Sequence, residues 1–231
     1  MEESKTWRAV DTVLAILAAA ILAYGVLVLH WSVFVVVALF WLENVVIGVL
    51  NVGKMLITGA RIGGAALLGA LALGAFFTVH YGMFTAVHGV FVVGLFGEPE
   101  LGRSANGLFA PLAQMIGFLI ADRDGSIAVV AIVALQISMF VRWMRVLQTD
   151  LTTLPTLMFA PYGRIIILHV TIIAGGALVL ALKAPVAGAL LLIGLKLAFD
   201  LKIAASGNPL ALQGWRRKRF YSATGDHATR P

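Results

Sequence analysis

Several side chains that could do chemistry lie within the apolar segments of this chain. Six ionisable or metal-ligating residues occupy such positions, namely Glu43, His80, His88, His169, Lys196 and Asp200. Ionisable groups are costly in hydrocarbon, and where they occur they usually face an interior pathway or site. These six residues are therefore the first candidates for a functional site.

A metal centre is one chemistry that these residue types favour. The chain has no cysteine, so any metal would be bound through histidine, aspartate or glutamate. We predict His80, His169 and Asp200 as ligands, with Glu43 as a further ligand or as the catalytic general base. A zinc, iron or manganese ion held there would activate water toward a lipid-like substrate that enters from the bilayer.

The two histidines of the third apolar segment cannot bind one metal ion as a pair. His80 and His88 are eight residues apart, which is about 12 Å of rise along a helix. Each could instead donate to a nearby backbone carbonyl and hold helices together. That structural interpretation is favoured for His88, and for His80 and His169 both interpretations stay open.

The charged residues have possible partners in the sequence. A carboxyl group in hydrocarbon is uncharged unless a cation lies beside it, and Lys196 or Arg164 could keep Glu43 charged. Lys196 and Asp200 stand four residues apart, the spacing at which opposite charges meet on a helix. Asn44 adds a polar group beside Glu43, and Arg164 is expected to anchor its helix at the membrane surface.

Two other functions would use the same residues. A proton-coupled transporter or ion pathway would carry protons or coordinate a solute with Glu43, His169, Lys196 and Asp200. A haem-b electron carrier would bind its iron through two of the three histidines. Whether the protein is an enzyme stays open at this stage.

The composition predicts that lipid is the solvent of this chain. Of its 231 residues, 61% are hydrophobic and 12% are charged, whereas soluble domains contain about 25% charged residues. The net charge of +6 includes a cluster near the C-terminus, from Arg216 to Arg219. A cytoplasmic flank explains that cluster better than nucleic-acid binding does.

The apolar pattern predicts an all-α polytopic bundle with six spans and one shorter interfacial or re-entrant helix. A fourteen-residue stretch from Leu108 to Ala121 is too short to cross the bilayer as a helix. Residues 1–207 should form one transmembrane domain, followed by a basic cytoplasmic tail at 208–231. The predicted spans are Thr12–Leu29, Ser32–Leu56, Gly63–Phe96, Ser126–Val146, Tyr162–Leu182 and Val186–Ala205.

The distribution of basic residues predicts that both termini lie in the cytoplasm. Six spans place most of the lysines and arginines that flank them on one side of the membrane, and the cytoplasmic side carries such an excess. Dropping one span, or counting the Leu108 stretch as a seventh, would scramble this asymmetry. The expected location is a bacterial cytoplasmic (inner) membrane.

Three sequence stretches resemble an uncharacterised family of bacterial polytopic integral membrane proteins. They are residues 41–48 (WLENVVIG), 80–88 (HYGMFTAVH) and 161–169 (PYGRIIILH). The resemblance extends from about the second span to Asp200 and Lys202. It implies a membrane-embedded helical fold, and it implies no activity because that family is one of unknown function.

Overall fold

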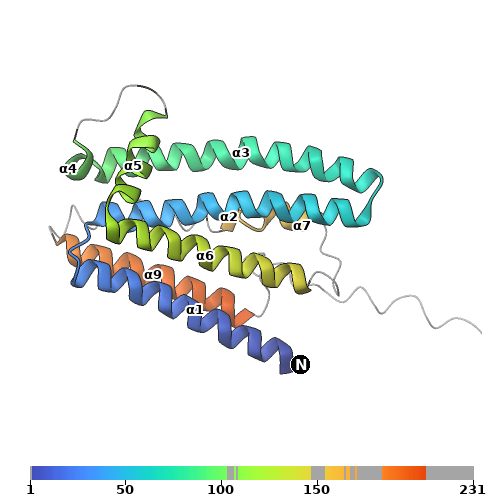
Figure 1. Cartoon of the computed structure of the whole chain (residues 1–231), viewed down its shortest axis with the longest axis horizontal. Coiled ribbons are helices and arrows are strands. Elements are labelled where there is room, and N and C mark those ends of the chain that lie inside the picture. Colours follow the sequence, from blue (N-terminus) through green and yellow to red (C-terminus); the bar gives the residue numbers. More distant parts are fainter. Residues whose placement is uncertain are drawn as a thin grey trace, which may run out of the picture.

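The computed structural model describes residues 2–102, 107, 109–146, 154–163, 165–166, 170 and 184–206. Every regular element in these residues is a helix, which confirms the predicted all-α class. The helices shown in Figure 1 are α1 (Glu2–Leu27), α2 (Val33–Ile62), α3 (Ala65–Phe96), α4 (Glu98–Leu101), α5 (Ala110–Ala121), α6 (Arg123–Val146), α7 (Leu154–Phe159) and α9 (Pro185–Ser206).

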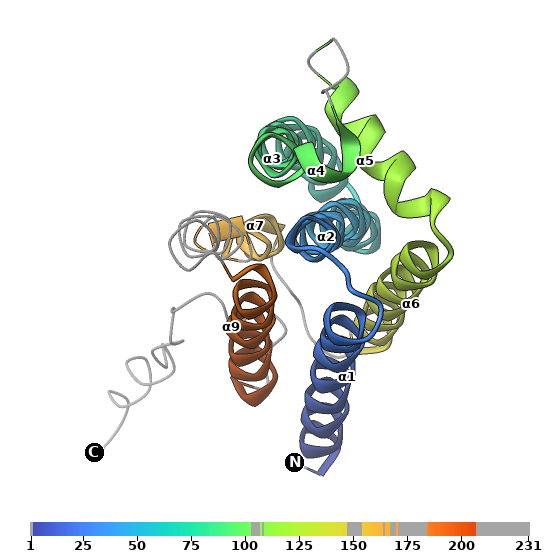
Figure 2. The ribbon, with the colours of Figure 1, turned by 90° about the vertical axis from the view of Figure 1, so that its left-hand side faces the viewer.

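Helix α2 is the central element, and the other helices surround it (Figure 2). Ser32 caps its start by accepting a hydrogen bond from the backbone N–H of Val35. The most apolar window of α2 is 67% buried, whereas the corresponding windows of α3 and α6 are 22% and 11% buried. A helix that is apolar on all sides is expected to be buried or to face lipid, and α2 is the one buried by protein.

Two glycines form the turn between α2 and α3. Gly63 has a φ of 78° and Gly64 a φ of 53°, values that side-chain-bearing residues rarely adopt. The turn sends α3 back along α2, where a Cβ on Gly48 would lie only 2.6 Å from the ring of Tyr81. The two helices therefore pack in direct contact over much of their length.

Three helices, α2, α3 and α6, are long and apolar enough to cross a membrane. They correspond to the predicted second, third and fourth spans, and α2 continues six residues beyond the predicted end at Leu56. The residues of the first and last predicted spans form helices α1 and α9. The structure supports three helices that are able to cross a membrane and does not support the predicted number of six. Most of the predicted span Tyr162–Leu182 and the whole tail at 208–231 lie outside the described residues.

The predicted short helix is present as α5, which begins at Ala110. Pro111 stands in its first turn, where proline is favoured because its missing N–H needs no helical partner. The helix runs across the end of the bundle between α3 and α6 (Figures 1 and 2). It buries Met115 and Leu119 against the core around α2.

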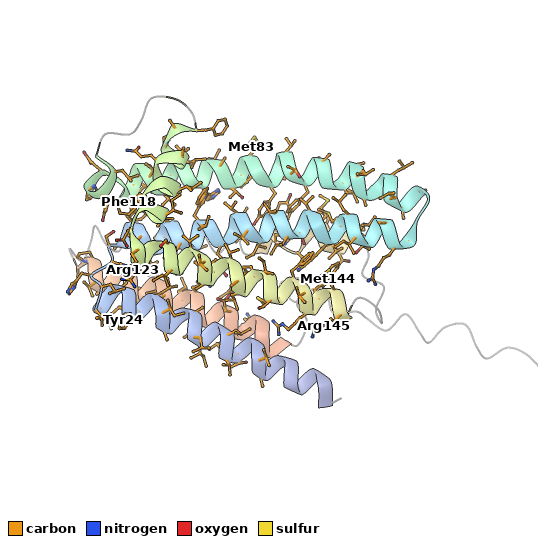
Figure 3. The ribbon with its side chains drawn as sticks, viewed as in Figure 1. Tyr24, Met83, Phe118, Arg123, Met144 and Arg145 are labelled. Carbon is orange, nitrogen blue, oxygen red and sulfur yellow. The ribbon has the colours of Figure 1, made fainter. Side chains whose placement is uncertain are left out.

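The two ends of the bundle differ in charge. Arg145, near the end of α6, lies at the end of the bundle where the N-terminus lies (Figures 1 and 3). Tyr24 and Arg123 lie at the other end (Figure 3), where the sequence also places Asp122 and Asp124 next to Arg123. The end with Arg123 thus carries two acidic groups beside one basic group, which is the direction of the charge asymmetry in the sequence.

Candidate functional site

Lys196 joins two carboxylates from different helices. Its ammonium nitrogen lies 2.6 Å from Oδ2 of Asp200, one turn further along α9, and 3.0 Å from Oε2 of Glu43 on α2. The side chains are 18% exposed for Lys196, 16% for Asp200 and 10% for Glu43. The predicted pairing of Lys196 with Asp200 and the predicted meeting of Glu43 with Lys196 are both present in the structure.

A third helix contributes Gln136 to this network. The side-chain amide of Gln136 on α6 donates a 2.9 Å hydrogen bond to Oε1 of Glu43. Oε1 of Glu43 thus accepts a hydrogen bond from α6, and Oε2 accepts one from α9. We call Glu43, Gln136, Lys196 and Asp200 the ionic network.

Sequence reasoning missed Gln136. The available signal was a single glutamine in the middle of α6, a helix whose charged residues all lie near its ends. Polar side chains within apolar helices usually bond across to a neighbouring helix. Gln136 is only 6% exposed. Once the positions of the helices are known, this burial identifies Gln136 as part of a polar contact between helices.

Helical geometry explains why these residues meet. Glu43 is ten residues past the start of α2 and Lys196 is eleven past the start of α9, so each lies about 15 Å along its helix. Phe40, one turn before Glu43, places its ring 5.6 Å from the ammonium of Lys196. A cation over an aromatic face gains further electrostatic stabilisation.

One hydrogen-bond donor of the ammonium is left over. A lysine ammonium has three N–H donors, and within the described part of the chain Lys196 bonds to one oxygen of Glu43 and one of Asp200. Its remaining contact is with the ring of Phe40. Among the described residues, the third N–H thus has no oxygen acceptor.

An apolar cavity of about 280 Å³ borders the ionic network. Glu43, Gln136 and Lys196 all line it, together with Phe40. Most of the remaining wall comes from apolar side chains of two helices, including Leu14, Leu17 and Ile21 of α1 and Ala128, Ala131 and Leu135 of α6. Since Leu17 is 52% and Ile21 46% exposed, the cavity reaches the outer surface of the bundle beside α1.

His80 lies in a different environment from the ionic network. Its ring stacks on Phe76 with centroids 5.4 Å apart, and it also contacts the rings of Phe84 and Tyr162. These neighbours belong to α3 and to the segment that follows α7, whereas the ionic network lies among α2, α6 and α9. The structure brings Glu43 and Asp200 together through Lys196, and it gives His80 aromatic neighbours.

His88 makes the structural contact that the spacing favoured. Its Nδ1 donates to the backbone oxygen of Phe84, one turn earlier on α3, and the side chain is 3% exposed. Asn44 likewise bonds locally, from its amide nitrogen to the backbone oxygen of Phe40 at 2.9 Å. Neither contact links these residues to the ionic network.

The remaining predicted residues, His169 and Arg164, lie outside the described residues. Among the side chains that the structure describes, no three of His, Cys, Asp and Glu gather closely enough to hold a metal ion. Of the predicted ligands His80, His169 and Asp200, His169 is the one that lies outside the described residues. The metal hypothesis consequently stays a prediction without structural support.

A second group of polar contacts lies on another face of α2. Trp41 donates from its indole N–H to the backbone oxygen of Thr85 at 2.7 Å, and Asn51 donates to that of Leu157 at 2.8 Å. The hydroxyl of Tyr81 donates to the backbone oxygen of Asn44 at 3.1 Å. We call this surface of α2, with Trp41, Asn44, Gly48 and Asn51, the neutral face.

The chain belongs to a family of unknown function (DUF6498), whose family model matches residues 1–218. This confirms the resemblance to an uncharacterised family that the sequence stretches indicated. No curated protein and no solved structure matches the chain.

Proposed function

For this member of a family of unknown function, we propose a role in proton-coupled transport across a membrane, with the ionic network as the proton-binding site. The observation that carries the proposal is the bridge from Lys196 to both Glu43 and Asp200 beside a cavity. Charged groups buried within transmembrane helices are characteristic of proton relays and substrate pathways.

The network can change its bonding when one proton is added. A proton that binds Oε2 of Glu43 removes that carboxylate's charge and weakens its bond to the ammonium. Lys196 keeps its closer partner, Asp200, at 2.6 Å. Loss of the proton restores the bond between α9 and α2, so proton binding is coupled to the contact between two helices.

The surroundings favour transport over a purely structural ion pair. A purely structural ion pair gains nothing from an unfilled space beside it, because the side chains that line such a space lose van der Waals contacts. This network instead borders an apolar cavity, which provides room for a solute next to the charged groups. Binding sites between helices of a bundle commonly combine such an apolar wall with few polar groups.

The proposed topology has six spans with both termini in the cytoplasm of a bacterium. It adds α1, α9 and the segment Tyr162–Leu182 to the three helices that are long and apolar enough to cross. The positions of Lys54, Arg61 and Arg145 near the ends of α2 and α6 support it, because cytoplasmic flanks carry excess lysine and arginine.

Proton binding can be tested by infrared difference spectroscopy on protein in lipid nanodiscs. Acidification should produce the absorption of a protonated carboxyl group, and Glu43→Gln should remove that component. Glu98→Gln is the matched control because Glu98 is an exposed residue of α4 at the end of the bundle. Equal spectra for the two variants would overturn the role of Glu43.

Transport itself requires a second measurement. In proteoliposomes with an imposed pH gradient and a fluorescent pH indicator inside, the wild-type protein should accelerate proton movement. Glu43→Gln should reduce the rate to that of protein-free liposomes, and Glu98→Gln should leave it unchanged. Proton movement that persists in Glu43→Gln would contradict the proposal.

A further inference from the structure

The cavity between α1 and α6 has the composition of a binding site for one class of molecule. We propose that it binds an uncharged amphiphile whose polar end is a hydrogen-bond acceptor, such as a carbonyl oxygen. This inference deepens the proposed function, on which it rests, by naming the substrate class of the same site.

The polar end of the ligand is indicated by the groups that line the cavity. Lys196 offers one N–H that has no oxygen acceptor in the described part of the chain, and Lys196 lines the cavity. An oxygen placed there would complete the three bonds of the ammonium. A ligand that only donates hydrogen bonds would leave this donor unused.

The charges of the network disfavour a charged ligand. A carboxylate on the ligand would approach Lys196 only by also approaching Glu43 and Asp200, which would repel it. An ammonium on the ligand would be close to the ammonium of Lys196, and Oε1 and Oε2 of Glu43 already accept from Gln136 and Lys196. A neutral acceptor meets neither repulsion.

The apolar part of the ligand is indicated by the walls and their position. Leucine, isoleucine and alanine side chains of α1 and α6 form most of the lining. The exposed side chains Leu17 and Ile21 are at its edge, so a ligand dissolved in the bilayer could enter sideways. A volume of about 280 Å³ lies at the lower end of small-molecule sites, which suits one ring or one short chain.

A matched set of probes tests the polar end without changing the protein. Phenylbutanone, butylbenzene, phenylbutylamine and phenylbutyrate each combine a phenyl ring with a short alkyl chain, and they differ in the head, which is a neutral acceptor, absent, cationic or anionic. Binding of each radiolabelled probe would be measured on full-length protein in zwitterionic nanodiscs, with empty nanodiscs subtracted. The ketone should bind saturably and at least about tenfold more tightly than the other three, since a hydrogen bond to a charged group contributes about one such factor.

Two alanine substitutions on one helix test the location. Ala131→Leu places a larger side chain in the cavity and should weaken ketone binding by about tenfold or more, which corresponds to about 1.4 kcal/mol. Ala134→Leu makes the same change at an exposed position of α6 that does not line the cavity, so its affinity should equal that of the wild type. Matching elution on size-exclusion chromatography would show that both variants fold.

The possible outcomes separate this inference from the proposed function. Equal or tighter binding of butylbenzene, of the amine or of the carboxylate would overturn the neutral acceptor as the ligand class. Equal affinities of Ala131→Leu and Ala134→Leu would overturn the location. Proton movement that depends on Glu43 without ketone binding would overturn only the inference, and ketone binding without such proton movement would overturn only the proposed function.

Discussion

The two polar surfaces of α2 use opposite ways of burying polar groups. The ionic network joins Glu43 to charged and amide side chains of α6 and α9, next to a cavity. On the neutral face, uncharged side chains donate to backbone oxygens, as in the bond from Asn51 to Leu157, and the packing is tight enough that Gly48 touches the ring of Tyr81.

If the proposed function is correct, this difference separates helix packing from transport within one helix. A neutral side chain bonded to a backbone oxygen has no charge to move and only one suitable geometry, so it fixes how α2 sits against α3 and α7. A carboxylate bonded to an ammonium can lose its charge with one proton, and the adjacent cavity has room for the solute that the proposed function requires. We therefore expect substitutions on the neutral face to change stability and those in the ionic network to change transport as well.

The largest stability effect is expected from Lys196→Met. The substitution leaves the buried carboxylates of Glu43 and Asp200 without their shared cation, and removing one partner of a buried ion pair costs about 3 kcal/mol or more. Unfolding of the purified protein in detergent, followed by circular dichroism at neutral pH, would measure the loss.

A double substitution distinguishes loss of charge balance from loss of packing. Adding Glu43→Gln to Lys196→Met removes one of the uncompensated charges and should recover part of the stability. A double variant that is no more stable than Lys196→Met alone would contradict the contrast between the ionic network and the neutral face. The ionic network would then stabilise the protein through its shape and not through its charges.

A smaller loss is expected from Gly48→Ala on the neutral face. The new Cβ would lie 2.6 Å from the Tyr81 ring, which is itself 3% exposed and stacked on Phe77. Overpacking of a tight contact costs about 1–3 kcal/mol, measured by the same unfolding experiment. In a Tyr81→Ala background the same substitution should cost less, and an equal cost in both backgrounds would show that the ring is not the obstacle.

The sequence was sufficient for four of the helices and for the residues that α2 and α9 contribute to the ionic network. Apolar run lengths predicted α2, α3, α5 and α6 to within a few residues of most ends, because an apolar helix must be long enough for the membrane and stops at glycine or charge. The pairing of Lys196 with Asp200 followed from their four-residue spacing, a property of one helix alone.

The rest required the arrangement of helices in space. Gln136 was not predicted because nothing in α6 shows which neighbour its side chain will face. The same limit applies to His80, whose type fits a metal ligand but whose neighbours are aromatic rings from α3 and the segment after α7. Residue type gives the possible chemistry, and only the packing of separate helices selects among the possibilities.

The smallest expected effect, from Tyr81→Phe, tests the neutral face most selectively. The substitution removes only the hydroxyl that donates to the backbone oxygen of Asn44 at 3.1 Å, while the ring keeps its packing against Gly48. Hydrogen bonds between membrane helices contribute about 0.6 kcal/mol on average, so stability should fall by about that amount. Proton movement in proteoliposomes should equal that of the wild type. A transport defect in Tyr81→Phe as large as that of Glu43→Gln would mean that both faces of α2 take part in function, and the division between them would have to be abandoned.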